Sequence, residues 1–141
     1  MARKITDEIR EQVRRRANLL CEYCHTNERW QYVRFTVDHV VPGGESSPAN
    51  LALACFHCNR RKSDKTEAID PETNKLVEIF NARQHFWKTH FTWSADGLRI
   101  IPLTSIGRAT VALLELNRER ILSIREADVV VNRHPPIDDL N

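Results

Sequence analysis

Four cysteines in two closely spaced pairs constrain this chain more than any other feature of its sequence. Cys21 and Cys24 stand in CEYC, Cys55 and Cys58 stand in CFHC, and thirty residues separate the pairs. A CxxC turn directs both thiolates towards one point, and two such turns complete a tetrahedral sulfur cage around Zn²⁺. Four thiolates leave no coordination position for water or substrate. We therefore predict a structural zinc site, with a redox CxxC or plain buried cysteines as the alternatives.

The composition places the chain among ordinary globular proteins. Its 141 residues are 41% hydrophobic and 28% charged, which suits one domain with a modest core. The first residues lack the apolar stretch of a signal peptide, and no segment is long enough to span a bilayer. We expect a cytoplasmic protein that does not contact membranes, and a reducing compartment disfavours disulfides between these cysteines. His25 and His57 lie beside the pairs and could replace a thiolate, although we expect them at the surface.

The net charge of +2 hides an uneven distribution. Residues 1–16 hold six Lys or Arg against three acids, and residues 59–65 hold four against one. From Glu115 onward the balance reverses, with four Arg against six acids. A basic excess in the first half is typical of a protein that binds a polyanion. For the run VRRRAN alone, a solvated helix face is the simpler interpretation.

Residue patterns predict the elements of the first half. Thr6 can cap a helix whose apolar residues recur every three or four positions and which ends at the first cysteine pair. Alternation over residues 33–37 predicts a half-buried strand, and PGGESSPAN predicts a loop. Residues 51–54 predict a second strand that leads into the second cysteine pair. A helix can begin after Cys58, in NRRKSDK.

The second half gives weaker signals. AIDPETNKLVEIF predicts a hairpin around PETN, and HFTWSADGLRIIPLT predicts another that turns at Asp96 and Gly97. NARQHFWKTHF between them can form a short helix. GRATVALLELNRERILSIREADVVV is helical in pattern, with a break at Asn117, and its apolar residues suit a core better than a binding groove. Trp87, Phe91 and Trp93 are interpreted as packing residues.

Polar residues gather where the predicted elements of the first half end. Asp38 and His39 end the first strand, Asn50 opens the second, and Asn59 follows the last cysteine. Because a zinc cage joins the two cysteine pairs, Asn59 should return to the strand that carries Asp38. An isolated Asp-His pair is usually a simple hydrogen-bonded pair. In this setting the carboxylate, amide and imidazole, approached by Arg and Lys side chains, form a plausible site for hydrolysing a phosphodiester.

With these motifs, the sequence resembles the HNH endonuclease family, which has a ββα-metal fold. VDHVVPGG, NLALAC and CFHCNRRKSD carry the resemblance in order, over roughly residues 17–65. Asn59 stands where the family name has its last histidine, so this chain is an HNN variant with two CxxC zinc knuckles. The resemblance implies an α+β fold. Its zinc-stapled HNH motif would follow an N-terminal helix and precede hairpins and C-terminal helices.

The resemblance also implies roles for individual residues. His39 would be the general base, and Asn50 would hydrogen-bond across the loop and hold His39 in position. Asp38 and Asn59 would bind one catalytic divalent ion, and their oxygen donors favour Mg²⁺ or Mn²⁺. Phosphates of DNA would meet four basic side chains, namely Arg60, Arg61, Lys62 and Lys65.

These inferences lead to two functional hypotheses. The first is a metal-dependent endonuclease that hydrolyses DNA phosphodiester bonds, by nicking or double-strand cleavage. The second is a zinc-stabilised nucleic-acid-binding module with little or no catalysis. In either case we expect residues 1–66 to form the zinc-stabilised core with its N-terminal helix. Residues 67–141 would form a hairpin and helical extension packed on the same domain.

Overall fold

The computed structural model describes residues 4–136 and divides them into two compact units. The first unit holds the described residues up to Thr66 together with Asn81–His85, and Arg83 of that short segment forms an ion pair with Glu22. The second holds Glu67–Phe80 and the described residues from Phe86 onward. Helices and small antiparallel sheets occur in both units, so the fold is α+β as predicted. The packing of residues 67–141 on the zinc-stabilised core stays a prediction.

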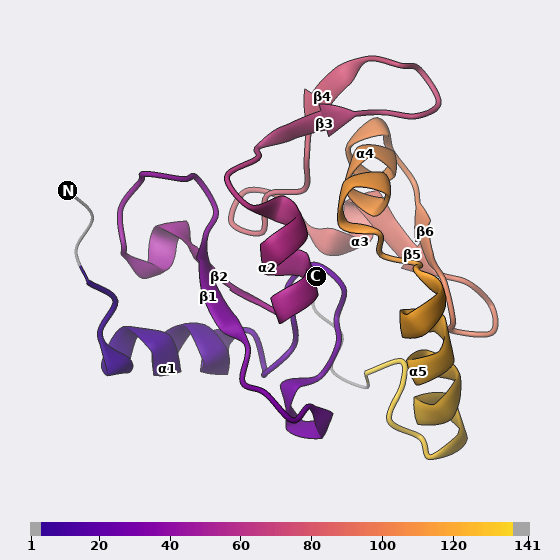
Figure 1. Cartoon of the computed structure of the whole chain (residues 1–141), viewed down its shortest axis with the longest axis horizontal. Coiled ribbons are helices and arrows are strands. Elements are labelled where there is room, and N and C mark those ends of the chain that lie inside the picture. The colour runs from indigo at the N-terminus through magenta and orange to yellow at the C-terminus, as the bar shows by residue number, and fades with distance from the viewer. Residues whose placement is uncertain (1–3, 137–141) are drawn as a thin grey trace. The chain divides into compact units, whose positions relative to one another are not determined.

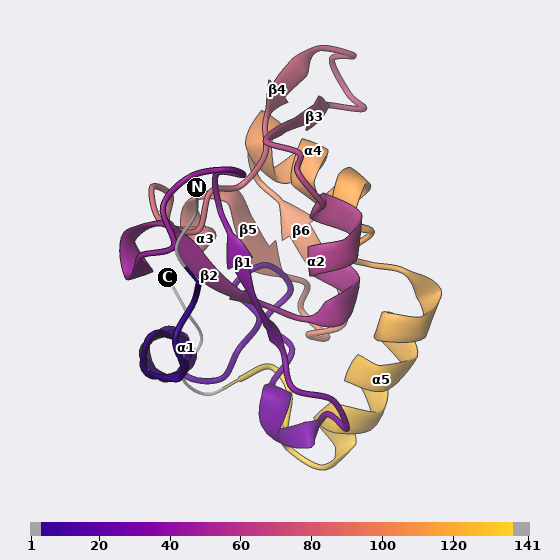
Figure 2. The same ribbon diagram turned by 60° about the vertical axis from the view of Figure 1, so that its left-hand side comes forward.

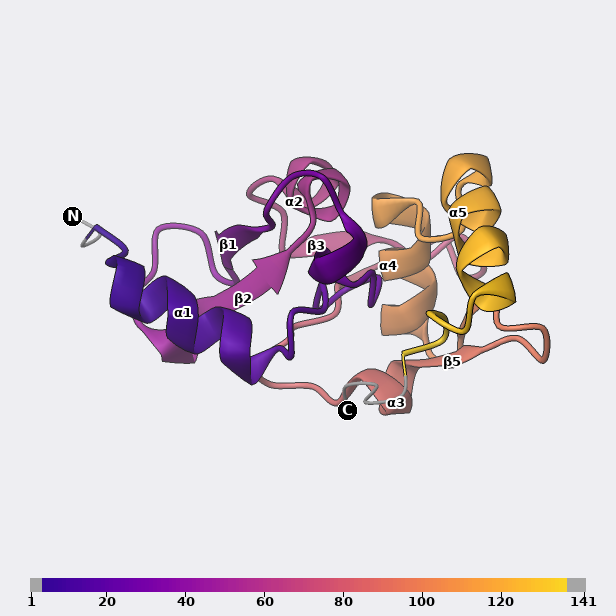
Figure 3. The same cartoon turned by 90° about the horizontal axis from the view of Figure 1, so that it is seen from below.

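The first unit is built on one antiparallel strand pair. Its elements are α1 (Asp7–Arg16), η1 (Glu28–Trp30), β1 (Thr36–His39), η2 (Pro48–Asn50), β2 (Leu51–Ala54) and α2 (Phe56–Lys62). β1 pairs with β2 in the register Asp38 to Ala52 and His39 to Leu51. α1 and α2 lie on opposite sides of this pair (Figures 1 and 3). A small apolar core, made by Val13, Ala17, Val37, Leu51 and Leu53, joins α1 to the strands.

α1 forms for the reasons read from the sequence. The Thr6 hydroxyl accepts a hydrogen bond from Ile9 N at 3.2 Å, which satisfies one of the free amides at the helix start. Asp7 and Glu8 lie in the first turn and three arginines in the last, so both ends suit the helix dipole. The helix ends at Arg16, short of the first cysteine pair, because Asn18 and Leu19 adopt left-handed backbone angles.

Two boundaries differ from the sequence prediction. The first strand runs over Thr36–His39 and not over residues 33–37, and Val33 is 64% exposed. The Phe35 amide donates to a Glu28 carboxylate oxygen at 2.7 Å, so it takes no part in a strand pair. The second helix begins at Phe56, before Cys58. Cys55 is its N-cap residue, and the Cys55 sulfur accepts a hydrogen bond from Cys58 N. Asn59 is therefore the fourth residue of α2.

The second unit contains the two predicted hairpins and the interrupted helix. Its elements are β3 (Glu67–Ile69), β4 (Leu76–Glu78), α3 (Trp87–His90), β5 (Phe91–Trp93), β6 (Ile100–Pro102), α4 (Ser105–Leu114) and α5 (Glu119–Val130). Gly97 turns the second hairpin with a φ of +75°. Glu115 adopts a left-handed conformation that ends α4, close to the predicted break at Asn117. α4 packs against β3, β4 and β6, as Figures 1 and 2 show. Trp87 and Phe91 are buried in this unit, as predicted.

Candidate active site and metal centre

The four cysteines meet in one buried cluster. Cys21 and Cys24 lie in the turn after α1, and Cys55 and Cys58 lie at the start of α2. All four are free thiols, and their sulfur atoms lie within 4.8 Å of one another. The Sγ atoms of Cys24 and Cys55 are 3.7 Å apart. Four sulfurs at 2.3 Å from a tetrahedral zinc would be separated by about 3.8 Å, so the spacing fits a metal centre of this type.

The chemistry of the cluster also fits a cation. Burial raises the pKa of the Cys21 thiol well above its usual value. Hydrogen bonds with Cys21, Cys55 and Cys58 lower the pKa of the Cys24 thiol well below its usual value. A divalent cation would supply the positive charge that lets buried thiols ionise together.

His25 departs from its expected place. It is only 1% exposed, and the group of potential metal ligands found among the described residues contains the four cysteines without it. The expectation of a surface imidazole is thus wrong for His25, which directly follows the first cysteine pair and adopts a positive φ of 59°. His57 is half-buried on α2.

A pocket of about 390 Å³ opens at the end of β1. Its walls come from β1, the following Gly-rich loop and the end of α2: Thr36, Val37, Asp38, His39, Pro42, Gly43, Gly44, Asn59, Ser63 and Asp64. Neighbouring strand residues normally point to opposite faces, but β1 ends at His39, so Asp38 and His39 can both border this pocket. Three of the four predicted site residues, Asp38, His39 and Asn59, therefore line one hollow.

Asp38 is held by two buried side chains from other elements. Its Oδ2 atom lies 3.2 Å from the Lys62 ammonium and accepts a hydrogen bond of 3.2 Å from the Tyr23 hydroxyl. Burial raises the pKa of the Asp38 carboxyl above its usual value, although the Lys62 charge and hydrogen bond act in the opposite direction. Both contacts are made by one carboxylate oxygen. The second oxygen, Oδ1, is the one left for a ligand in the pocket.

Lys62 was predicted at the nucleic-acid surface, and the structure places it inside the unit. It is 1% exposed, and its ammonium also donates to the His39 carbonyl at 3.1 Å. The physical reason is helix geometry, because Lys62 follows the buried Cys58 by four residues and so shares its face of α2. The four-residue spacing from Cys58 to Lys62 can be seen in the sequence and could have predicted the burial of Lys62. Arg60, Arg61 and Lys65 are exposed, as a phosphate contact requires.

Tyr23 connects the cysteine cluster to the pocket. It stands between the cysteines of CEYC, is fully buried, and reaches Asp38 through its hydroxyl. Burial and the nearby Asp38 charge raise the pKa of Tyr23 well above its usual value, so the phenol stays a hydrogen-bond donor. No sequence pattern indicated this contact, because it depends on how the first knuckle folds against β1.

His39 is oriented by the loop that follows it. Its Nε2 atom lies 2.9 Å from the Ser46 hydroxyl, a residue that sequence reasoning did not single out. Val40 N donates to the Asn50 carbonyl at 2.9 Å, which continues the strand pairing just beyond His39. The imidazole is half-buried at the rim of the pocket. A ring in this position can exchange a proton with a molecule bound in the pocket.

Asn50 fastens the loop between the strands. Its side-chain oxygen accepts from Val41 N at 2.9 Å, and its amide donates to the carbonyls of Val41 and Glu45 at 3.1 and 3.0 Å. A side chain at Gly44 would place its Cβ only 2.7 Å from the Asn50 amide, so this loop requires glycine. These contacts are the hydrogen bonds across the loop that the sequence predicted for Asn50, and they reach His39 only through the backbone of the loop.

The comparisons with known proteins agree with this arrangement. The family described as HNH endonuclease matches residues 19–65, which include both cysteine pairs and all four predicted site residues. No curated protein and no solved structure matches the chain significantly. No helix in the described part of the chain is long and apolar enough to cross a membrane. Residues 19–65, with their clustered cysteines and their ββα arrangement, are therefore a domain of the HNH endonuclease family.

Proposed function

We propose that the protein is a metal-dependent endonuclease that hydrolyses phosphodiester bonds of DNA. One observation carries the proposal: Asp38, His39 and Asn59, from a strand end and a helix, line a single open pocket inside a family domain. Exposed Arg60, Arg61 and Lys65 follow on α2 and just after it, where they can meet phosphates. The proposed structural ion in the cysteine cluster is Zn²⁺.

His39 is the proposed general base. Because Nε2 contacts Ser46, Nδ1 is the ring nitrogen left to take a proton from the attacking water. Asn50 and Gly44 keep the loop in the shape that holds the ring at the rim of the pocket. An imidazole can both accept and donate a proton, so it suits this role.

Asp38 and Asn59 are the proposed ligands of a catalytic Mg²⁺ or Mn²⁺. When bound, such an ion stabilises the charge that develops on the phosphate and on the leaving oxygen. Oδ1 of Asp38 and the amide oxygen of Asn59 are hard donors, as these ions prefer. The Lys62 ammonium already balances the Asp38 charge, so we expect weak binding of the ion without substrate phosphate.

The same ion pair supports a second candidate function. A carboxylate neutralised by Lys62 and a neutral amide at position 59 together offer little charge to a divalent ion. The chain would then be a zinc-stabilised module that binds nucleic acid with little or no hydrolysis. Both candidates predict DNA binding that weakens with salt, because contacts from Lys and Arg release counterions.

Supercoiled plasmid distinguishes the two candidates. Purified protein should convert it to nicked or linear forms with added Mg²⁺ or Mn²⁺, and EDTA should stop the reaction while zinc content, measured afterwards, is retained. His39→Ala should slow cleavage by about 10²–10⁴-fold, and Asn59→Ala should lose cleavage at ordinary ion concentrations. His57→Ala, a histidine of α2 outside the pocket, is the matched control and should cleave like the parent. DNA binding without cleavage in any ion would favour the second candidate.

A further inference from the structure

We propose that residues 29–34, with the sequence RWQYVR, are a second nucleic-acid contact that stacks on unpaired bases. We call this segment the aromatic loop. All six residues are exposed: Tyr32 is 104% exposed, Val33 64% and Trp30 45%. The inference extends the proposed function, because it assigns to the same unit a preference for unpaired nucleic acid.

The aromatic loop is fastened at its base by a buried carboxylate. Glu28 is 7% exposed, and its Oε2 accepts from Phe35 N at 2.7 Å, which closes the loop from one end to the other. Arg14 of α1 binds the same carboxylate with both terminal nitrogens, at 2.7 and 2.5 Å. Asn27 caps the short η1 helix by accepting from Arg29 N. These hydrogen bonds fix the backbone at both ends of the loop that carries the exposed rings.

These side chains contribute little to the core of the unit. Trp30, Tyr32 and Val33 together leave apolar surface in contact with water, which is unfavourable. Exposed apolar patches of this kind mark interaction sites. Contacts within the unit hold the base of the loop, through Glu28 and through Arg29, which donates to the backbone and side-chain oxygens of Asn18 at 3.4 Å. Tyr32 and Val33 at its tip lie open to water, and a partner outside the unit would give them a role.

The positive charge of the aromatic loop favours a polyanion as its partner. Arg29 and Arg34 stand at its two ends, and no acidic residue lies between them. A groove or loop that alternates cations with aromatic rings is the usual platform for single-stranded nucleic acid, in which arginines follow the phosphates and bases stack on the rings. In a duplex the base faces are already stacked, so Tyr32 and Trp30 gain little from it.

The position of the aromatic loop suits a substrate that also reaches the pocket. The loop leads into β1, and Asp38 follows Arg34 by only four positions. An extended chain of that length spans at most about 14 Å, roughly two to four nucleotides of a single strand. One strand can therefore contact Tyr32 while its backbone passes Asp38 and His39.

The test compares one labelled 20-nucleotide DNA as a single strand and as a duplex, by fluorescence anisotropy in buffer without added divalent ions. Tyr32→Ala should weaken single-strand binding by about 5- to 150-fold, the range for loss of one base–aromatic stack. Duplex binding should change by less than about twofold. Tyr32→Phe retains the ring and should bind like the parent. Phe86→Ala, which removes another exposed ring, 67% exposed, from the other unit, is the matched control.

Arginine is tested separately through salt dependence. Arg34→Gln should reduce the slope of log K against log salt by about one phosphate contact on either DNA. Unchanged single-strand affinity in Tyr32→Ala, or equal losses on both DNAs, would overturn the assignment, and the latter would indicate general damage. Plasmid cleavage reports the proposed catalysis independently. If the parent cleaves plasmid but Tyr32→Ala binds single strands as tightly as the parent, this inference alone is refuted. If the parent cleaves no plasmid but Tyr32→Ala loses single-strand binding selectively, only the proposed nuclease activity is refuted.

Discussion

At the scale of single residues, Lys62 shows how one buried charge sets the properties of the pocket. Its ammonium lies 3.2 Å from Asp38 Oδ2, and both side chains are almost completely buried. The ion pair fixes the position of the carboxylate, and the Lys62 ammonium also donates a hydrogen bond to the His39 carbonyl. Tyr23 adds a second contact to the same Asp38 oxygen. Lys62 and Tyr23 are thus positioning residues for Asp38 in the proposed reaction.

Breaking this pair should be costly. Lys62→Met leaves the Asp38 carboxylate buried without its counterion and should lower the free energy of unfolding by about 3–5 kcal/mol. The double variant Lys62→Met with Asp38→Asn removes both charges and should recover much of that loss, without recovering cleavage. Urea unfolding followed by circular dichroism measures the differences. Lys65→Met removes an exposed lysine as the control, and a single Lys62→Met as stable as the parent would contradict the pair.

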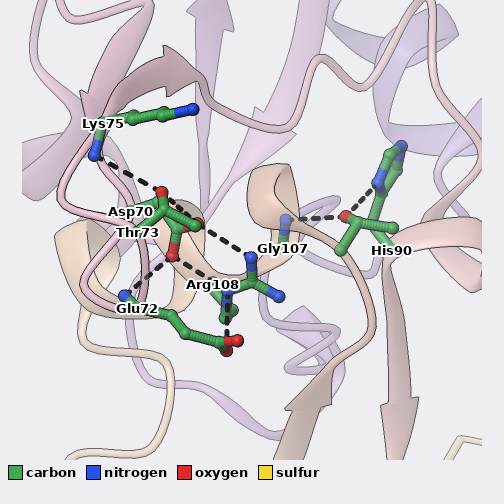
Figure 4. A network of polar contacts seen from close by, with 8 residues as sticks. Asp70, Glu72, Thr73, Lys75, His90, Gly107 and Arg108 are labelled. Atoms are coloured by element: carbon green, nitrogen blue, oxygen red, sulfur yellow. Dashed lines mark hydrogen bonds and ion pairs between the residues drawn. The ribbon is translucent and has the colours of Figure 1, made fainter.

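At the scale of elements, one carboxylate joins the β3–β4 hairpin to α4 (Figure 4). Asp70 is completely buried, and Arg108 of α4 binds both of its oxygens, at 2.9 and 2.8 Å. The same carboxylate accepts from Glu72 N and from the Thr73 hydroxyl, which shapes the PETN turn. Arg108, followed by these turn donors, holds the pKa of Asp70 well below its usual value.

The stability of the second unit should therefore depend on pH. Because the pKa of Asp70 is lower in the folded than in the unfolded state, its contribution is complete above the unfolded value of about 4. The contribution is lost as pH falls below that value. Asp70→Asn should melt below the parent at pH 7, and the two melting curves should converge towards pH 2. In a Trp30→Phe background the remaining tryptophans, Trp87 and Trp93, both lie in this unit, so their fluorescence reports its melting. A melting difference that stays constant with pH would contradict the linkage.

At the scale of the whole molecule, the cysteine cluster and the second hydrophobic core are separate sources of stability. The cluster joins two knuckles separated by thirty residues in a unit with a small apolar core. The second unit packs its own aromatic side chains, with Trp87 and Phe91 ring centroids 5.1 Å apart. Metal should thus matter mainly to the first unit.

Elemental analysis should find one zinc ion per chain, and Cys55→Ser should lose it. Serine caps helices well, so the variant keeps a cap for α2 and the loss of structure can be assigned to the metal. Hydrogen exchange by mass spectrometry should show lost protection in α1, β1, β2 and α2, with protection in α4 and β5 retained. A zinc-free protein that keeps protection in the first unit would contradict this prediction.

The sequence by itself determined the features that depend on local chemistry. The two CxxC pairs predicted a cluster of four thiols. The spacing within each pair determines a turn that brings its two sulfurs together, and four sulfur ligands suit a tetrahedral zinc ion. Thr6 specified the start of α1, and PETN and Asp96-Gly97 specified two hairpin turns. The order of Asp38, His39, Asn50 and Asn59 was sufficient to place the candidate site within the HNH family, since these residues occupy element ends that the cysteine cluster gathers.

Only the tertiary structure decided which distant side chains meet. Asp38 accepts a hydrogen bond from Tyr23, fifteen residues before it, and forms an ion pair with Lys62, twenty-four residues after it. The sequence pattern had placed Lys62 at the surface. The strand begins at Thr36 because Glu28 withdraws the Phe35 amide, an effect that alternation of apolar residues does not encode. Asp70 meets Arg108 across thirty-eight residues. Burial and charge pairing depend on the packing of separate elements, whereas turns, caps and metal knuckles depend on neighbours along the chain.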